Sequence, residues 1–381
     1  MKKILSIVLC LVMVLSLAAC GGGNTPVDEN TDNNGEAKTS GFKIGYSIGY
    51  VGNAWRSQLV SALEEVAEEY KADGTIAEFQ VVSADNDSTT QISQCNAMLA
   101  EGLDALLICA VSPTTLTSVV ETAKEMGTLV ILSNDPAVYE GTYCCINNAS
   151  TYTALIDRWF ATQVESGSDI VYISGNPGNG TDGIRDAQAY SDIEKYGWNL
   201  LAEAPGKRNQ AEAQNVMTTF LSAYKNIDGV LCQNVTFEGV KHAYDNANIP
   251  MPPVTGDSVM STIRMLAEMD NYQSIGVTNS PGVGADSLHF AVLLLQGYEL
   301  KADALTPNPL DETLVNAVQV DPPVAITLDG ELPEDILADY PLLTVLSYAE
   351  AIEMYADMED TYTPDAVMSR QDCIDTWFVA K

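Results

Sequence analysis

Residues 42–56 have the sequence FKIGYSIGYVGNAWR, in which an apolar segment, a short polar loop and the start of a helical pattern follow one another. Phe42–Ile48 is rich in aromatic and β-branched residues, which is typical of a buried strand. Beyond Trp55, apolar residues recur at helical spacing and glutamates occupy the opposite face. Because open α/β sheets bind small ligands between the carboxyl end of a strand and the next helix, residues 49–56 form a candidate ligand loop. The predicted apolar face consists of Leu59, Leu63, Val66, Ala67 and Tyr70.

The candidate loop contains three side chains whose chemistry suits a neutral, hydroxyl-rich ring such as a sugar. Asn53 supplies a hydrogen-bonding amide, Trp55 a flat face for stacking, and Arg56 a fork of five N–H donors. The alternative is structural: Trp55 would be a core aromatic residue and Arg56 a solvated residue of the first helical turn.

The rest of the chain repeats the alternation of strand and helix. Such alternation predicts parallel sheets with right-handed crossovers, and about ten units exceed one doubly wound sheet. We therefore expect two similar α/β lobes. Ser112 and Pro113 are expected to cap and begin a helix that runs to Met126. The further expected strands are residues 79–83, 105–110, 128–133, 169–174, 199–204, 229–232, 251–256 and 273–278, and the expected helices include 151–166 and 281–296. Residues 315–320, followed by Pro322 and Pro323, are expected to form a crossover.

The first residues have the character of an export signal. Lys2 and Lys3 precede an apolar run that ends in Leu17-Ala18-Ala19-Cys20, and this run is too short to span a membrane. Residues 1–19 are thus expected to be a signal peptide. The Leu-Ala-Ala-Cys ending resembles a bacterial lipobox, which implies that Cys20 carries a lipid; ordinary cleavage without a lipid is the alternative. Residues 20–41 are expected to form a flexible linker, and the folded part to be extracytoplasmic and anchored to the cell membrane.

Composition argues against several classes of partner. The chain has 52 acidic and 18 basic residues and a formal net charge of -34, which argues against binding to nucleic acid or to anionic lipid surfaces. Its eight cysteines show no CxxC or Cys/His zinc spacing, and it has two histidines. We expect no metal and no cofactor, and buried free thiols, with a pairing of Cys373 left open.

Several motifs in their order resemble the type I periplasmic sugar-binding proteins of the ribose-binding group. These motifs are the lipobox, the acidic linker, Ile44-Gly45-Tyr46-Ser47 followed by Asn53 and Trp55, and Gln233-Asn234 after an apolar strand. Such proteins are the substrate-binding subunits of sugar ABC importers. The resemblance covers residues 42–346. It implies two lobes joined by three hinge crossovers, with residues 42–149 and 281–318 in one lobe and residues 150–280 and 319–346 in the other.

The resemblance also implies a function and a ligand set. A monomeric protein would capture a monosaccharide or related polyol by hinge closure, without catalysis, and deliver it to an ABC permease. Arg56 departs from the family pattern because it replaces a second aromatic residue, and Val235 replaces the Asp of a Gln-Asn-Asp motif. Each position has a structural alternative, as a strand-end cap or an interlobe hydrogen bond. Either Asn134 or Asp135, and either Thr278 or Asn279, would face the ligand. The implied ligand residues are Asn53, Trp55, Arg56, Asn134, Asp135, Arg185, Asn234, Asp257 and Asn279.

Two motifs favour an enzyme instead. Gly45–Gly49 fits the G-x-S-x-G pattern around a nucleophilic Ser47, although this Ser lies inside the expected strand. Gly178–Gly183 fits the dinucleotide-binding pattern G-x-G-x-x-G and has Glu203 at the expected distance downstream. One alternative function is therefore that of a lipid-anchored NAD-binding enzyme. A second alternative, which does not depend on these motifs, is a sensory ligand-binding subunit that uses the same cleft. Residues 347–381 extend beyond the resemblance, and their place on a lobe, at the cleft or against a permease stays open.

Overall fold

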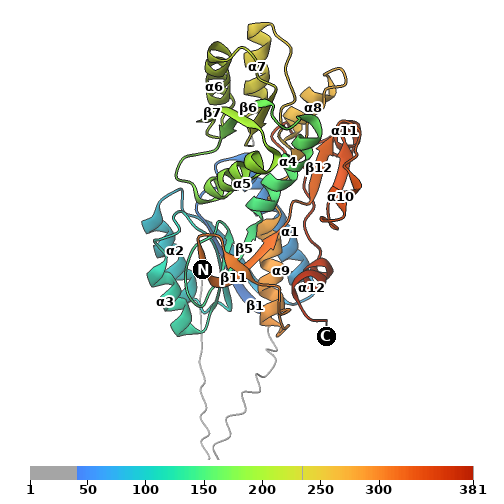
Figure 1. Cartoon of the computed structure of the whole chain (residues 1–381). Coiled ribbons are helices and arrows are strands. Elements are labelled where there is room, and N and C mark those ends of the chain that lie inside the picture. Colours follow the sequence, from blue (N-terminus) through green and yellow to red (C-terminus); the bar gives the residue numbers. More distant parts are fainter. Residues whose placement is uncertain (1–40, 234, 381) are drawn as a thin grey trace, which may run out of the picture. The chain divides into compact units, whose positions relative to one another are not determined.

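A computed structural model describes residues 41–233 and 235–380 (Figure 1). The expected signal peptide, Cys20, the linker up to residue 40 and Asn234 lie outside the described residues. In the described part of the chain, no helix is long and apolar enough to cross a membrane.

The first lobe is built on a seven-stranded sheet with the order β10-β11-β5-β4-β3-β1-β2. All neighbouring pairs are parallel except β10 and β11, which are antiparallel. The carboxyl ends of β1, β3 and β4 therefore meet at one edge of the sheet. The strands are β1 (Phe42–Ile48), β2 (Ile76–Ser83), β3 (Ala105–Cys109), β4 (Leu129–Asn134), β5 (Tyr143–Asn147), β10 (Thr306–Asn308) and β11 (Asp311–Val320).

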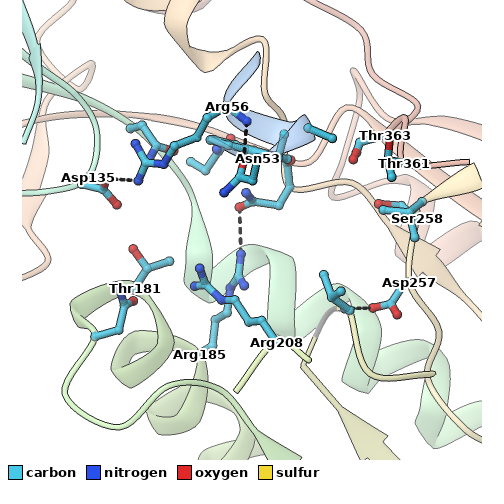
Figure 2. A pocket seen from close by; sticks show the side chains of 18 of the residues that line it. Asn53, Arg56, Asp135, Thr181, Arg185, Arg208, Asp257, Ser258, Thr361 and Thr363 are labelled. Atoms are coloured by element: carbon cyan, nitrogen blue, oxygen red, sulfur yellow. Dashed lines mark hydrogen bonds and ion pairs between the residues drawn. The ribbon is translucent and has the colours of Figure 1, made fainter. Parts of the chain in front are cut away.

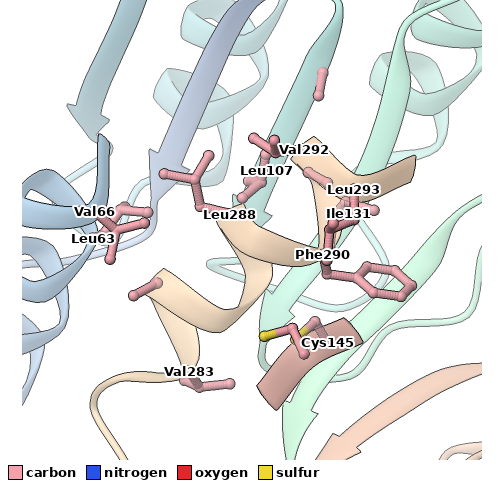
Figure 3. Packing of buried hydrophobic residues seen from close by; sticks show 14 of the residues in the cluster. Leu63, Val66, Leu107, Ile131, Cys145, Val283, Leu288, Phe290, Val292 and Leu293 are labelled. Carbon is pink, nitrogen blue, oxygen red and sulfur yellow. The ribbon is translucent and has the colours of Figure 1, made fainter. Parts of the chain in front are cut away.

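Helices cover both faces of this sheet. On one face, α1 (Ala54–Ala72) and α9 (Val283–Leu295) share a core with Leu107 and Ile131 (Figure 3). On the other face, α2 (Ser88–Ala100) and α3 (Thr117–Met126) pack against alternate residues of the same strands, such as Leu106 and Leu132. Burial on both faces explains why these strands are continuous apolar runs. The apolar face predicted for α1 is confirmed, because all five of its residues are buried.

The second lobe contains two three-stranded sheets, β7-β6-β8 and β13-β12-β9. A bridge between Val230 and Val254 and a bond from Gly256 N to Ile275 O (2.8 Å) connect them. One face is covered by α6 (Gln210–Ala223), α7 (Phe237–Ala247), α8 (Met260–Ala267) and α11 (Tyr348–Met354), and the other by α4 (Ala149–Gln163), α5 (Gly180–Tyr196) and α10 (Glu334–Leu337). The strands are β6 (Asp169–Ser174), β7 (Asn199–Pro205), β8 (Gly229–Cys232), β9 (Gly276–Val277), β12 (Val324–Thr327) and β13 (Thr344–Ser347).

The chain passes between the lobes at three places along its length and once more near its end. The three passages join β5 to α4, β9 to α9, and β11 to β12. The additional one leads from α11 on the second lobe to α12 (Arg370–Trp377), which packs on α9 of the first. There the rings of Trp377 and Phe290 meet edge to face, with centroids 5.7 Å apart. The predicted two-lobed α/β architecture is confirmed, with a fourth passage that was not expected.

Three local predictions are wrong. Ser112 and Pro113 do not begin α3, which starts at Thr117 after a turn. Residues 251–256 form only the isolated bridge at Val254, because Pro252 and Pro253 have no N–H to donate to a ladder. Strand β5 was not predicted, although it lies between β4 and β11 in the sheet.

Candidate ligand-binding site

A cavity of about 670 Å³ is lined by loops at the carboxyl ends of strands from both lobes (Figure 2). Eight of the nine predicted ligand residues line it, and the ninth, Asn234, lies outside the described residues. The sequence therefore located one cavity correctly; contact of these residues with a ligand stays a prediction. The eight are Asn53, Trp55, Arg56, Asn134, Asp135, Arg185, Asp257 and Asn279.

Asn53 and Trp55 each have a structural bond as well as a place on the cavity. The Asn53 side chain caps α1 by accepting a hydrogen bond from the Arg56 N–H (2.8 Å). The Trp55 indole N–H donates to the backbone oxygen of Asn279 (2.8 Å), and its ring is partly buried against the core of the first lobe. Core packing of the Trp55 ring is thus confirmed in part, and stacking of a ligand on the same ring stays a prediction.

Arg56 is held between two groups of the first lobe and is not a solvated residue. Its Nη2 lies 3.2 Å from a carboxylate oxygen of Asp135, and its Nη1 lies 2.8 Å from the Cys109 sulfur. Burial, and then the neighbouring Asp135 carboxylate, raises the pKa of the Cys109 thiol to about 12. The thiol is therefore neutral at physiological pH, and Arg56 forms its charged pair with Asp135 alone.

The turn after β4 brings two neighbouring residues to the cavity. Asn134 has a left-handed backbone (φ 67°), which Asn tolerates better than most residues. Asn134 and Asp135 both line the cavity. The sequence left open which of the two faces the ligand. The structure places both at the cavity, and which of them contacts a ligand stays open.

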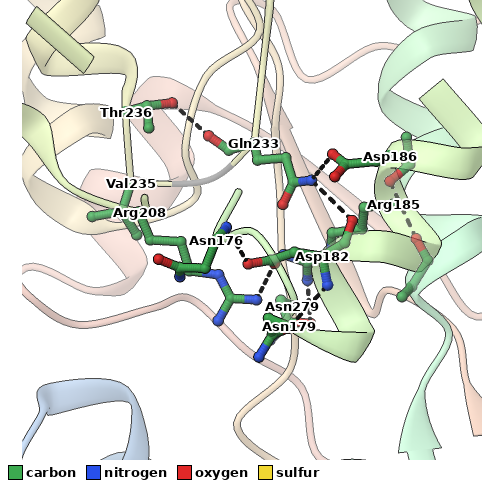
Figure 4. A network of polar contacts seen from close by, with 12 residues as sticks. Asn176, Asn179, Asp182, Arg185, Asp186, Arg208, Gln233, Val235, Thr236 and Asn279 are labelled. Carbon is green, nitrogen blue, oxygen red and sulfur yellow. Dashed lines mark hydrogen bonds and ion pairs between the residues drawn. The ribbon is translucent and has the colours of Figure 1, made fainter. Parts of the chain in front are cut away.

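Arg185 on α5 is the main polar group of the second lobe. It is 1% exposed, its guanidinium lies 4.3 Å from the centre of the Tyr152 ring, and burial lowers its pKa. Its Nη2 donates to the side-chain oxygen of Asn279 (2.8 Å), and Nη1 lies 3.9 Å from the Asp182 carboxylate, which also pairs with Arg208 (Figure 4). This network fixes Arg185 at the cavity wall.

Asn279 accepts hydrogen bonds from both lobes. Its backbone oxygen accepts from Trp55 of the first lobe and its side-chain oxygen from Arg185 of the second. The preceding Thr278 is fully buried and donates instead to the Pro364 carbonyl (2.7 Å). Of the two candidates at the end of β9, Asn279 is the one at the cavity.

Asp257 lines the cavity and also organises the loop that enters α7. Its carboxylate accepts hydrogen bonds from the N–H groups of Val235, Thr236 (2.9 Å) and Phe237 (3.2 Å). Val235 has φ 65°, a strained value for a β-branched residue, so these bonds hold a conformation that its side chain disfavours. Burial raises the pKa of Asp257 and the three N–H donors lower it in part, so that the pKa is about 7.

Comparison with known proteins identifies the family. Residues 44–299 match the family described as a periplasmic binding protein domain. The chain belongs to this family. It is 25% identical over 237 residues to the ribose import binding protein of Bacillus subtilis, covering 61% of this chain and 74% of that protein. It is 25% identical over 324 residues to the xylitol-binding protein of Mycolicibacterium smegmatis, covering 80% and 85%.

Solved structures share the fold of this periplasmic binding protein. An ABC transporter solute binding protein from Thermobispora bispora superposes with a TM-score of 0.63 at 20% identity, covering 88% of this chain and 94% of that one. A solute binding protein from Bacillus halodurans with bound myo-inositol has a TM-score of 0.61 at 20% identity, covering 80% and 100%. The predicted resemblance to type I binding proteins is confirmed for family and fold.

The two enzyme motifs have structural roles in this periplasmic binding protein. Ser47 is fully buried inside β1 and its hydroxyl accepts from Gln91 (3.2 Å), so it is not on an exposed nucleophile turn. In the Gly-rich loop, the buried Asp182 carboxylate accepts from Asn176 N–H (2.7 Å) and pairs with Arg208. A carboxylate at this helix start would repel a pyrophosphate, which a dinucleotide places there. Glu203 instead accepts from Ser174 (2.6 Å).

The cavity also contains residues that the sequence interpretation missed. Arg208 lines it from the turn before α6, and Ser258 from the loop before α8. A basic residue after a strand is a usable signal in a chain with only 18 Lys and Arg residues. Asp360, Thr361 and Thr363 line the cavity from the fourth passage, and no local pattern indicated this. The six described cysteines are buried and free, including Cys373.

Proposed function

We propose that this protein is an extracytoplasmic solute-binding lipoprotein that captures a monosaccharide or related polyol and delivers it to an ABC permease. One observation carries the proposal. Amide, guanidinium and carboxylate groups of both lobes line the same cavity as the Trp55 ring.

The chemistry of this lining suits a neutral ligand with several hydroxyl groups. Carboxylate and amide oxygens accept hydroxyl protons, while guanidinium and amide N–H groups donate to hydroxyl oxygens. Of the charged groups at the cavity, Arg56 forms an ion pair with Asp135 and Arg208 pairs with the buried Asp182, while the Asp257 carboxylate accepts hydrogen bonds from backbone N–H groups. A ligand that leaves these buried groups unsatisfied binds weakly, and this gives specificity.

The mechanism that we infer is hinge closure around the passages between the lobes. Trp55, Arg56 and Asp135 belong to one lobe and Arg185 and Asp257 to the other, so a ligand that touches both sets stabilises the closed arrangement. The names of relatives support the ligand class: one is a ribose import binding protein and another a xylitol-binding protein. Solved proteins of the same fold hold myo-inositol and D-allose.

The test is binding without turnover. Full-length protein in detergent would be screened by thermal shift against ribose, xylitol, myo-inositol, allose, arabinose and NAD. A ligand at 100 times its dissociation constant adds about 2.7 kcal/mol to the stability of the protein, which raises the melting temperature clearly. We expect a shift with a sugar or polyol, and recovery of that compound unchanged. A shift with NAD alone, or with none of the six, would overturn the proposal.

The lipid anchor is tested separately. We expect the protein to partition into the membrane fraction of its bacterial host and a Cys20→Ser variant to be released. Equal membrane retention of both would contradict lipidation at Cys20, while leaving the ligand proposal unaffected.

A further inference from the structure

The fourth passage between the lobes runs along the ligand cavity. We call residues 358–365 of this passage the strap. It begins beyond α11 on the second lobe and leads toward α12 on the first. Three of its residues, Asp360, Thr361 and Thr363, line the same cavity as the predicted ligand residues.

The strap is fixed to the second lobe at the start of α8. This helix has no side-chain cap at Val259. The Asp360 and Tyr362 carbonyls accept hydrogen bonds from the N–H groups of Ser261 and Met260, at 2.9 Å each. The strap thus satisfies amides that a helix start otherwise leaves without partners.

The side chain of Asp360 provides a second attachment of the strap to α8. Arg264 pairs with the Asp360 carboxylate and donates to the Met358 carbonyl (2.8 Å). Strap and helix are therefore joined by both backbone and side-chain bonds.

The other end of the strap is fixed to the first lobe. The Gln58 side chain on α1 donates to the Thr363 carbonyl (2.8 Å) and accepts from the Thr363 N–H (3.1 Å). Asp365 accepts from the Gly282 N–H (2.7 Å) in the passage between β9 and α9. The strap is therefore a positioned wall of the cavity and not a loose tail.

The strap leaves hydroxyl groups available on the cavity side. Within the described residues, Thr361 and Ser258 make no hydrogen bond through their hydroxyls, and the Thr361 side chain is exposed at the cavity. Figure 2 places Thr361 and Ser258 on the far side of the cavity from Asp135. These hydroxyls are therefore available for a hydrogen bond to a ligand in the cavity.

We propose that the strap is part of the ligand site, and that Thr361, with the Asp360 carboxylate, determines which sugar or polyol fits by hydrogen-bonding a ligand hydroxyl. This rests on the proposed function, because it names residues of the same site. The proposed contact joins the Thr361 hydroxyl to a hydroxyl group of the ligand, beside the Asp360 carboxylate. Because that carboxylate would repel an anion, the ligand edge at the strap carries hydroxyl groups and no negative charge.

The test uses full-length protein in detergent and calorimetric titration with ribose, xylitol, myo-inositol, allose and arabinose. Thr361→Val keeps the shape of the side chain and removes its hydroxyl. Loss of one hydrogen bond is expected to weaken binding of the preferred probe roughly 5-fold. The ratio of the affinities for different probes is also expected to change in Thr361→Val, because the probes differ in the hydroxyl group that would face the strap. Thr344→Val, at an exposed strand position away from the cavity, and Glu359→Gln, beside Asp360, are the matched controls and should bind as the unaltered protein does.

The outcomes separate this inference from the function on which it rests. An unaltered protein that binds no probe overturns both. Normal binding by Thr361→Val overturns the strap contact alone. An equal loss for every probe together with a lower melting temperature would assign Thr361 a structural role and also overturn it. Asp360→Asn, which keeps the backbone bonds of the strap, is the second variant and is expected to shift the probe preference in the same assay.

Discussion

At the scale of single residues, several side chains that line the cavity also form hydrogen bonds that hold the fold. Asn279 accepts from Trp55 of one lobe and from Arg185 of the other. Asn53 caps α1, and Asp257 binds three successive N–H groups at the entry to α7. Substitutions at these positions must therefore separate a lost ligand contact from a lost structural bond.

Trp55 allows such a separation. Trp55→Phe keeps a smaller aromatic face and loses the hydrogen bond to Asn279, whereas Trp55→Ala loses the aromatic face entirely together with that bond. We expect Trp55→Ala to weaken ligand binding at least about tenfold, because an aromatic ring contributes a large apolar contact area. Trp55→Phe should retain most of the affinity. Calorimetric titration checks both, and equal losses in the two variants would argue against a stacking role.

Asp286 on α9 is a buried carboxyl group away from the ligand cavity. One oxygen accepts from the Met368 N–H (3.0 Å), and the other has no hydrogen-bond partner within residues 41–233 and 235–380. Burial, reinforced by the neighbouring Asp365 carboxylate, raises its pKa well above the ordinary value. The folded protein therefore keeps this group protonated at a pH where the unfolded chain has already released the proton.

This difference predicts how Asp286→Asn depends on pH. As pH rises above about 4, the unfolded chain binds fewer protons than the folded one, so the stability of the unaltered protein falls by about 1.4 kcal/mol per pH unit from this group alone. Asn keeps the bond from Met368 and removes the titration. The stability advantage of the variant should be absent near pH 3 and grow toward neutral pH, as measured by urea unfolding. The exposed Asp303→Asn is the control, and a constant difference across pH would refute the prediction.

At the scale of elements, α12 shows that the last part of the chain belongs to the first lobe. Trp377 is 3% exposed and packs edge to face on Phe290, while Phe378 packs on Phe290 and Tyr298. The backbone of residues 377–379 also bonds to Glu299 and Lys301. These contacts hold the end of the passage that contains the strap.

Removing the Trp377 side chain should destabilise the first lobe. We expect Trp377→Ala to lower the free energy of unfolding by about 3–5 kcal/mol, because a large buried side chain leaves a cavity. Met354→Ala, at a position 60% exposed on α11, is the control and should change stability little. Urea unfolding measures both. A near-neutral Trp377→Ala would mean that α12 contributes little to the folded lobe.

At the scale of the whole protein, the proposed capture of a ligand depends on closure of the lobes. We expect the radius of gyration measured by small-angle X-ray scattering to fall when the bound sugar or polyol is added at saturation, and not when a non-binding member of the same panel is added. Because ligand groups are divided between the lobes, closure brings them together only around the ligand. An unchanged scattering profile with proven binding would show that this protein binds without closing.

The amino-acid sequence was sufficient for the local elements and for predicting eight residues that line one cavity. Apolar spacing identified β1, α1 and the buried face of α1, since these depend on residues close together in the chain. Asn53, Trp55 and Arg56 were predicted from the loop after β1, where an open α/β sheet binds ligands, and the other five candidates at the cavity were implied by the family resemblance. Local pattern was also enough to predict two lobes.

Tertiary structure decided which groups meet across long stretches of chain. Residues far apart in sequence meet in three places. Arg56 contacts Cys109 and Asp135, Asn279 accepts a hydrogen bond from Arg185, and the strap lines the cavity. The position of β5 depends likewise on its sheet partners, β4 and β11. Such contacts follow from packing of the completed lobes, and no periodicity within one segment encodes them.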